Sequence, residues 1–396
     1  MKAPGTRLDS TTENGRIRVA FLTPSLSPGG AERQMLILAA TLPAARFDIQ
    51  FILMSERGAW ASEADRLGVP VHVLGLSGPG CARLHPRCAL AAAHALRRYV
   101  ALTRHVDVVD AWLVPAFTFA GLARLFARVP VVLAGRRSLL DHYAGKAWYR
   151  RVAASWATRR ADAVVANSEA AYREAIERER IRSERVALIP NAVLPHPVDL
   201  ADRHRRRASW GFGPDDIVVG CVANYKPGKG LETLIEVATR LRDRAPRLRY
   251  VVVGEGPLRD DLEAATARAG LGTVFVLAGQ VDDAREVFPA FDIAVQASIS
   301  EGLPNALLEA ASAGRPIIAT AVGGTIDIIN SDDVGVLVRP GDAGDLADSL
   351  LRLANDEDLR LRLGDAAQRR SLDFSAERLA ESTARLYERL ILDHHR

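Results

Sequence analysis

The chain has 396 residues, enough for two domains, and its 48% hydrophobic and 25% charged residues are typical of a globular protein. Its three cysteines are too few and too unevenly placed for a disulfide framework or a zinc site, which favours a reducing, cytoplasmic compartment. Residues 1–15 are polar, so we expect a flexible tail without a secretory signal, and the longest uncharged apolar run, 111–123, is too short to span a bilayer.

Charge is unevenly distributed along the chain. The net charge is +4, but residues 16–195 carry 25 Lys and Arg against 14 Asp and Glu, whereas residues 196–396 carry 25 against 32. A basic first half suits an anionic membrane surface, a phosphorylated acceptor or another polyanion. A solvated arginine-rich surface without a partner explains the same numbers equally well. No motif suggests a nucleic acid as the partner.

Short apolar runs alternate with helical patterns in both halves. Strands are predicted at residues 18–23, 49–54, 69–74, 106–110, 131–135, 163–166 and 186–189, and again at 217–222, 250–253, 274–277, 293–296, 316–319 and 334–338. This alternation predicts βαβ units and a parallel sheet in each half. The predicted fold class is therefore α/β, with two Rossmann-like, doubly wound domains facing each other across a cleft.

The domain limits follow from composition. A segment rich in proline, glycine and charge, near 194–214, separates an N-terminal domain at 16–195 from a C-terminal domain at 213–372. Residues 373–396 form a last helix, which we expect to pack back toward the N-terminal domain.

Two features of the first half carry possible chemistry. Gly29 and Gly30 follow the first strand and open a helix, where glycine allows close approach of a ligand and the helix end favours an anion. In the helical segment 146–160, Trp148, Val152 and Trp156 recur every four residues, with arginines elsewhere on the helix. Aromatic and basic residues together suit a membrane interface, although a helix packed on a sheet is the commoner reason for such a stripe.

Two turns of the second half are candidates for nucleotide contacts. Lys226 and Lys229 lie in a glycine-flanked turn after the strand at 217–222, where an ammonium could neutralise a diphosphate, although a plain basic turn before a helix fits too. The Gly254-Glu-Gly256 turn follows another strand and allows close approach to a nucleotide.

The most informative segment is 298–320, SISEGLPNALLEAASAGRPIIAT. Glu301 is predicted in a turn before a helix, Glu309 inside the helix, and Pro304 in its first turn, where proline is best tolerated. The free N–H groups near Leu303, Asn305 and Ala306 then form a phosphate site, and Glu309, roughly 7–8 Å along the helix from Pro304, is placed to accept bonds from a ribose. An ordinary strand–turn–helix unit is the alternative.

A strand-borne D-x-D metal motif is absent from the sequence. Asp356-Glu-Asp358 matches the letters, but it begins a helix, where acidic residues act as caps. We therefore expect phosphate to be held by lysine and helix dipoles, with no metal and no other cofactor.

Taken together, these segments resemble the retaining glycosyltransferases of the GT4 group, which have the two-domain GT-B architecture. The resemblance covers about residues 16–390 and rests on Gly29–Glu32, Ala166–Ser168, Ile189–Ala192, Lys229-Gly230, Gly254–Gly256, Ala278-Gly279 and the two glutamates within Ser298–Gly314.

The resemblance implies transfer of a sugar from a nucleotide-diphosphate sugar to an acceptor hydroxyl of a glycan, a lipid-linked molecule or a small molecule, with retention at the anomeric carbon. Lys229 and Glu301 would be the catalytic residues. By position, Glu309 would hold the ribose, Lys229 the diphosphate, the backbone of Leu303, Pro304, Asn305 and Ala306 the distal phosphate, and Glu301 the donor sugar. Gly254 and Val281 would line the nucleoside pocket, and Gly29 and Gly30 would face the donor.

Two positions depart from the family pattern. Asn224 stands where members commonly have arginine, so the diphosphate charge rests on Lys229, with help from Lys226. Many members have a histidine after the strand at 106–110, where this chain has Asp110-Ala-Trp112. Some members have tryptophan there and a later arginine pair, so the resemblance places Asp110, Trp112, Arg136 and Arg137 on the acceptor side.

Other functions stay open at this level. A sugar-nucleotide epimerase or hydrolase of the same architecture, or a non-catalytic protein that binds a nucleotide or a membrane, fits the same residues. The charge distribution leaves peripheral attachment to the inner face of the plasma membrane as an option.

Overall fold

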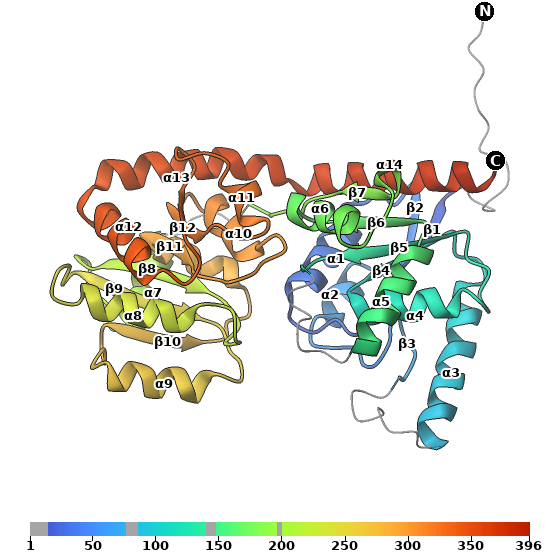
Figure 1. Cartoon of the computed structure of the whole chain (residues 1–396), viewed down its shortest axis with the longest axis horizontal. Coiled ribbons are helices and arrows are strands. Elements are labelled where there is room, and N and C mark those ends of the chain that lie inside the picture. Colours follow the sequence, from blue (N-terminus) through green and yellow to red (C-terminus); the bar gives the residue numbers. More distant parts are fainter. Residues whose placement is uncertain (1–14, 77–85, 140–147, 196–199) are drawn as a thin grey trace, which may run out of the picture. The chain divides into compact units, whose positions relative to one another are not determined.

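A computed structural model describes residues 15–76, 86–139, 148–195 and 200–396. The chain forms two compact units. The first unit contains the chain up to Asn167, Ala171–Pro190 and Ala376–Arg396, and the second contains Ser168–Ala170 and Asn191–Ser375. Figure 1 shows a parallel sheet flanked by helices in each of them.

The first unit is built on a seven-stranded, fully parallel sheet with the strand order β3-β2-β1-β4-β5-β6-β7. Its strands are β1 (Ile17–Thr23), β2 (Phe47–Leu53), β3 (Val71–Val73), β4 (Val108–Trp112), β5 (Val131–Arg136), β6 (Ala163–Ala166) and β7 (Val186–Leu188). The helices are α1 (Gly30–Thr41), α2 (Ala61–Arg66), α3 (Pro86–Thr103), α4 (Val114–Ala123), α5 (Trp148–Arg160), α6 (Glu169–Glu177), the short 3-10 helix η3 (Ser183–Arg185) and α14 (Ala376–His394).

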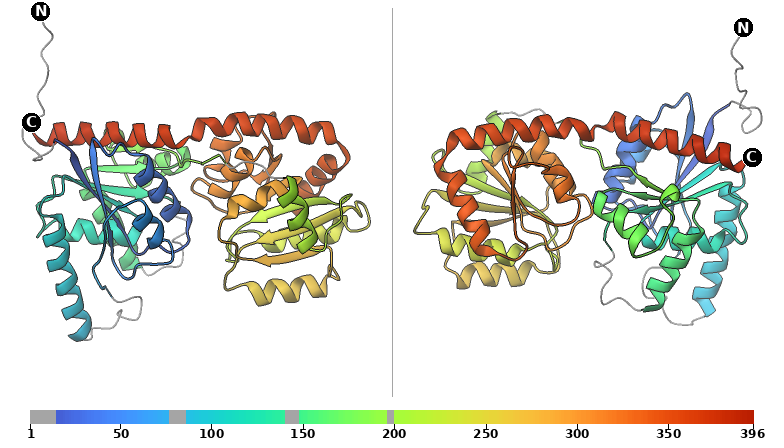
Figure 2. Two further views of the ribbon diagram at one scale, coloured as in Figure 1. Left: turned by 180° about the vertical axis from the view of Figure 1, so that it is seen from behind. Right: turned by 45° about the horizontal axis from the view of Figure 1, so that its top comes forward.

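Alternating residues of these strands enter different packing layers. Ala20 and Leu22 of β1 pack into one core with residues of α3, α4 and α5, while Phe21 contacts Phe51 and Trp112. Figure 2 shows the helices α3, α4 and α5 gathered beside the sheet. Strands that are buried on both faces in this way are expected to be continuous apolar runs, as the sequence has them.

The second unit is built on a six-stranded parallel sheet with the order β10-β9-β8-β11-β12-β13. The strands are β8 (Ile217–Val222), β9 (Leu248–Val253), β10 (Phe275–Gly279), β11 (Ile293–Gln296), β12 (Ile317–Thr320) and β13 (Val336–Val338). The helices are α7 (Leu200–Ser209), α8 (Leu231–Leu241), α9 (Arg259–Arg268), α10 (Asn305–Ser312), α11 (Thr325–Ile328), α12 (Ala343–Asn355) and α13 (Glu357–Ser371), with the 3-10 helices η4 (Ala284–Ala290) and η5 (Leu372–Phe374).

Two cores cover the two faces of this sheet. Ile217, Val219 and Cys221 of β8 pack with α8, α9 and α12, whereas the intervening Val218 packs with α10 and η4. Both helical layers are visible in Figure 1. Because consecutive strand residues point to opposite faces, the β8 run must be apolar throughout.

The predicted α/β class with two Rossmann-like parallel-sheet domains is confirmed, and each predicted strand overlaps an observed one. The unit limits differ from the expected residues 195 and 213, because the second unit begins at Asn191 and includes α7. Arg203 and Arg207 of α7 reach Asp292, with nitrogen–oxygen distances of 2.7 and 2.6 Å, and so join α7 to the second sheet. Helix α14 lies in the first unit.

Helix α5 packs through small residues. A Cβ atom on Gly121 of α4 would lie 2.8 Å from that of Ala157, so glycine is needed for the two helices to meet this closely. Trp156 is half-buried against the core, and the Arg160 guanidinium lies 4.8 Å from the centre of its ring. Val152, by contrast, is exposed. The Trp148 side chain lies outside the described residues. Part of the predicted stripe is therefore packing surface.

Candidate functional site

The two predicted catalytic residues lie next to each other in the second unit. Lys229 comes from the loop between β8 and α8, and Glu301 from the loop between β11 and α10. Because β8 and β11 are neighbouring parallel strands, both loops leave the same edge of the sheet. Lys229 Nζ lies 2.6 Å from Glu301 Oε1, and both side chains are partly exposed. The ammonium and the carboxylate thus form a direct ion pair that a ligand can reach from solvent.

Backbone contacts fix these two loops together. The Ile299 N–H donates to the Gly228 carbonyl at 2.8 Å. Gly230, which precedes α8, has φ +66°, and a Cβ atom there would lie 1.9 Å from the Ala297 carbonyl oxygen. Only glycine combines this left-handed backbone with such close approach. The main chain therefore places Lys229 next to the loop that carries Glu301, and the ion pair joins the two side chains.

Two residues that sequence reasoning missed also bind Glu301. The Gln296 amide donates to Glu301 Oε1 at 2.8 Å, and the Ser298 hydroxyl donates to the same oxygen at 2.7 Å. The signal available in the sequence was weak: two polar residues, two positions apart, where an apolar strand ends.

The turn before α10 is held from both sides. Helix α10 begins at Asn305, and Pro304 is its N-cap in an extended conformation, so the expectation that Pro304 lies in the first turn is wrong by one residue. Proline still fits, because an extended N-cap conformation is the one that the residue before a helix adopts. The Leu308 N–H donates to the Pro304 carbonyl at 3.3 Å.

Asn191 anchors this turn and was not predicted to have a role. Its buried amide donates to the Leu303 carbonyl at 3.0 Å and to Asn305 Oδ1 at 2.7 Å. The Gly324 N–H donates to the Gly302 carbonyl at 2.6 Å on the same turn. The first N–H groups of α10, including that of Ala306, thus begin from a fixed position, as an anion site requires.

Glu309 lies half-buried on α10, one helical turn beyond this N-terminus. Arg285 of η4 is its charged neighbour: hydrogen bonding to Asp283 raises the pKa of Arg285, and the charges of Asp283, Glu309 and Glu286 add to the effect. Arg285 was not singled out from the sequence, because only the fold brings η4 next to α10.

The other donor-side candidates of the second unit lie in loops at the same edge of its sheet. Asn224 and Lys226 are exposed, and Val281 packs against the core. Gly254 has φ +150°, and a Cβ atom there would lie 2.0 Å from the Ala223 carbonyl oxygen. The need for glycine at 254 is therefore explained by packing of one loop on the next, and its place in a nucleoside pocket stays a prediction.

Gly29 and Gly30 lie in the first unit, where Gly29 precedes α1 and Gly30 begins it. Gly29 is the extended N-cap of α1, and a Cβ atom on it would lie 2.3 Å from Glu32 Oε2. Burial raises the pKa of this Glu32 carboxyl.

Three of the four acceptor-side candidates form a cluster within the first unit. Asp110 and Trp112 are buried inside β4, which runs two residues beyond the predicted strand end. Asp110 Oδ2 accepts a 2.7 Å hydrogen bond from the Tyr387 hydroxyl of α14, and the Arg137 guanidinium lies 3.7 Å from the centre of the Trp112 ring. Burial raises the pKa of Asp110 and lowers that of Arg137 to about 10. Tyr387 was missed, because 277 residues separate it from Asp110.

Arg136, the fourth candidate, has a different environment. It is buried, forms an ion pair with the buried Glu179, and its guanidinium lies 5.3 Å from the centre of the Phe117 ring. The structure therefore gives Arg136 internal contacts, and its assignment to the acceptor side stays a prediction.

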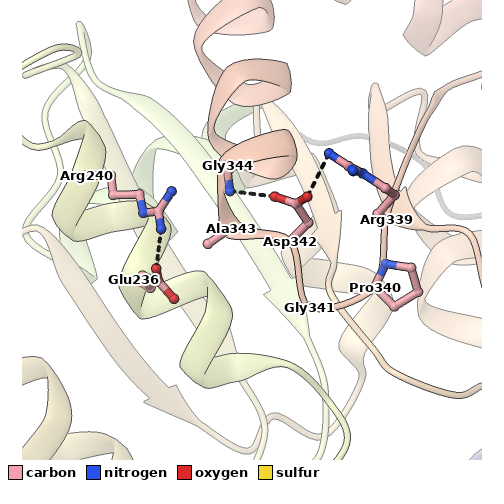
Figure 3. Close-up of a pocket in the computed structure, with 8 residues that line it drawn as sticks. All are labelled: Glu236, Arg240, Arg339, Pro340, Gly341, Asp342, Ala343 and Gly344. Atoms are coloured by element: carbon pink, nitrogen blue, oxygen red, sulfur yellow. Dashed lines mark hydrogen bonds and ion pairs between the residues drawn. The ribbon is translucent and has the colours of Figure 1, made fainter.

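A shallow pocket of about 450 Å³ lies elsewhere on the second unit, near the start of α12. Figure 3 shows its two ion pairs, Glu236 with Arg240 and Arg339 with Asp342. None of the residues predicted from the sequence lines it. Because its charges already pair with one another, we assign it no function.

The described part of the chain contains neither a cluster of metal-ligating side chains nor a membrane-spanning helix. No group of three or more His, Cys, Asp or Glu residues there is arranged to hold a metal ion. Asp356 caps α13 by accepting from the Leu359 N–H at 2.8 Å, as predicted. Among the described helices, none combines the length and the apolar character that crossing a bilayer requires.

Comparison with known proteins identifies both halves. Residues 28–195 match the model of Glycosyltransferase Family 4, and residues 202–370 match that of Glycosyl transferases group 1. The chain is 31% identical to the putative glycosyltransferase EpsD of Bacillus subtilis over 191 residues. The matched segment covers 48% of this chain and 50% of EpsD. It is 32% identical to the 2-deoxystreptamine glucosyltransferase of Streptomyces kanamyceticus over 206 residues, which cover 51% of this chain and 53% of that enzyme. These matches span about half the length of the curated relatives.

Solved structures share the fold over nearly the whole chain. HepE of Anabaena, in complex with UDP and glucose, has a TM-score of 0.82 at 21% identity and is matched over 94% of this chain and 100% of that one. Sucrose-phosphate synthase of Thermosynechococcus elongatus has a TM-score of 0.78 at 21% identity, and the match covers 96% of this chain and 100% of that one. With both halves matched by adjacent family models and both sheets by these structures, the chain belongs to the GT4-type glycosyltransferases of the GT-B fold.

Proposed function

We propose that the protein is a retaining glycosyltransferase that moves a sugar from a nucleotide-diphosphate sugar to an acceptor hydroxyl without a metal ion. The observation that carries the proposal is the Lys229–Glu301 ion pair beside the anchored N-terminus of α10. Family membership supports the same reaction, and HepE has been solved with UDP and with UDP-glucose, which makes a uridine nucleotide the first donor to test.

In this proposal the charge of the leaving group is held by the protein alone. The Lys229 ammonium and the first N–H groups of α10 face the diphosphate, and the acceptor attacks from the side that the leaving phosphate vacates, with that phosphate taking the proton. Donors that already point at the developing charge stabilise it without reorganisation. Glu301 binds sugar hydroxyls and Glu309 the ribose, while Asn224 adds no charge.

The acceptor side is proposed for the first unit, around Asp110, Trp112 and Arg137. We also propose an anionic membrane surface as a partner of this unit. Exposed Leu122, Leu125 and Phe126 near the end of α4, together with the basic excess of residues 16–195, support this partner.

A nucleotide panel followed by product analysis tests the reaction. We expect UDP or another nucleoside diphosphate to raise the thermal midpoint of the full chain, because a ligand that binds only the folded state stabilises it. With the matching sugar nucleotide, turnover is expected only when an acceptor hydroxyl is supplied. NMR of the product should show that the anomeric configuration is retained, and EDTA should not change the rate.

Single substitutions test whether Glu309 contacts the nucleotide. Glu309→Ala is expected to weaken UDP binding about tenfold, the effect of losing roughly 1.4 kcal/mol of hydrogen bonding to a charged group. Glu263→Ala, an exposed glutamate of α9, is the matched control and should bind like the wild type. Complete donor turnover without an acceptor would establish a hydrolase or epimerase instead. If no nucleotide binds, the proposal that the protein is a nucleotide-sugar enzyme is wrong.

A further inference from the structure

Among the described residues, the side chains that hold the carboxylate of Glu301 all bind the same one of its two oxygens. Oε1 accepts from Lys229 Nζ at 2.6 Å, from Ser298 Oγ at 2.7 Å and from Gln296 Nε2 at 2.8 Å. The Ser298 side chain is buried, and Gln296 is half-buried at the end of β11. Of these three donors, one is charged and two are neutral.

We propose that Gln296 and Ser298 are positioning residues that keep the Glu301 carboxylate aimed at the donor sugar; this rests on the proposed function. A carboxylate has about four lone-pair sites, so three bonds to Oε1 leave Oε2 to accept from sugar hydroxyls. Ordering a glutamate side chain costs roughly 1.5–2 kcal/mol of conformational entropy, and here that ordering precedes binding.

Neutral donors matter because Lys229 has a second partner in the proposed reaction. When the diphosphate binds, the ammonium is shared between it and Glu301. The amide and the hydroxyl then still hold the carboxylate, and neither adds a charge that would compete for the phosphate. The amide is fixed in this direction, because a carboxylate accepts hydrogen bonds and only the Nε2 side of Gln296 donates. Gln296 Oε1 is buried and has no partner among the described residues.

The main chain around these residues is anchored on two sides. The Thr320 hydroxyl of β12 donates to the Ser298 carbonyl, and the Ile299 N–H binds the loop that carries Lys229. A change confined to the Gln296 or Ser298 side chain therefore leaves the backbone of the site with its own contacts.

Gln296→Met, which removes the amide at nearly constant volume, and Ser298→Ala test the proposal. In the full chain, calorimetry with UDP and with UDP-glucose separates the two ends of the donor; GDP and GDP-glucose replace them if the panel selects guanosine. Each variant is expected to bind the nucleoside diphosphate within twofold of the wild type and the sugar nucleotide about tenfold more weakly. Gln368→Met is the control: it removes an amide of α13 that donates to the Ser312 carbonyl at the end of α10, and it should change neither affinity.

A Glu301→Ala background distinguishes positioning from general damage. There, the Gln296→Met and Ser298→Ala changes should have no further effect on UDP-glucose affinity, because the carboxylate they hold is gone. Equal losses in both backgrounds, or equal losses of UDP and UDP-glucose affinity, would overturn the positioning role while leaving the transferase intact. A wild type that binds no nucleoside diphosphate of the panel and none of the corresponding sugar nucleotides would instead overturn the proposed function, and this inference with it.

Discussion

Asp110 shows how a single buried side chain sets a pH dependence. It is a carboxyl inside β4, bonded to Tyr387 of α14, and burial raises its pKa above the usual 3.8. A pKa that is higher in the folded than in the unfolded chain contributes stability that is present below 3.8 and is lost as pH rises through the folded pKa. Ionisation of this position is therefore less favourable in the folded chain than in the unfolded chain, so stability falls as pH rises above 3.8 until the folded pKa is passed.

Asp110→Asn removes the ionisable carboxyl and keeps an oxygen that can accept from Tyr387. The free energy of unfolding of the variant, relative to the wild type, is expected to increase as pH rises from about 4 to 7. Urea unfolding of both proteins across this range measures the trend. Asp243→Asn, at a 90% exposed side chain, is the control and should shift stability by no more than about 0.5 kcal/mol. A flat or falling difference would mean that Asp110 is not destabilised by burial.

Candidate residues could be picked from the sequence where local chemistry marks the position, and their roles stay predictions. Glu301 and Lys229 stand next to turns with glycine and proline, and the structure brings them together. Asn191 and Tyr387 were missed for a common reason: their partners lie 112 to 114 and 277 residues away, and no local pattern encodes such a contact.

At the level of elements, strand β5 and the end of helix α6 are joined by a buried ion pair. Arg136 ends β5, Glu179 follows α6, and both side chains are 5% exposed. Removing one partner of such a pair leaves an uncompensated buried charge, whereas removing both does not. Because the pair joins elements of one unit, its loss is expected to appear as global instability rather than as a local catalytic defect.

Arg136→Leu is therefore expected to lower the free energy of unfolding by about 3–5 kcal/mol, and the double variant Arg136→Leu/Glu179→Leu to recover part of that loss. Chemical denaturation of the full chain measures both. Arg385→Ala, which breaks the exposed pair with Glu381, should cost less than about 1 kcal/mol. If the double variant is less stable than the single one, Arg136 acts through contacts other than Glu179, such as Phe117.

The elements themselves were readable from sequence because both sheets are parallel and buried. The run at 217–222 is apolar throughout and is strand β8. Boundaries were less certain: β4 continues through Trp112, because its polar Asp110 finds a partner on α14 and so stays inside the strand. A polar residue at a strand end looks like the start of a loop until that partner is known.

At the scale of the whole molecule, two features bear on membrane binding: the uneven charge, which the sequence shows, and a set of exposed apolar residues, which the structure shows. Residues 16–195 are basic and residues 196–396 acidic. In the first unit, Leu125 and Phe126 are 63% and 65% exposed, close in sequence to Arg124 and Arg128. Lys and Arg near an anionic membrane contribute about 1 kcal/mol each, and apolar side chains add to the affinity by burial.

Sedimentation of the full chain with vesicles tests this membrane proposal. Binding to phosphatidylglycerol vesicles is expected at low salt, with little binding to phosphatidylcholine and a marked loss at high salt, because salt screens charges that are farther apart than about 10 Å at 0.1 M. Leu125→Ser/Phe126→Ser should weaken binding severalfold. Leu361→Ser/Leu372→Ser, at residues that are 61% and 66% exposed in the second unit, should not. Binding that ignores lipid charge, or equal losses in both double variants, would rule out this surface and leave the basic half of the chain as solvated surface.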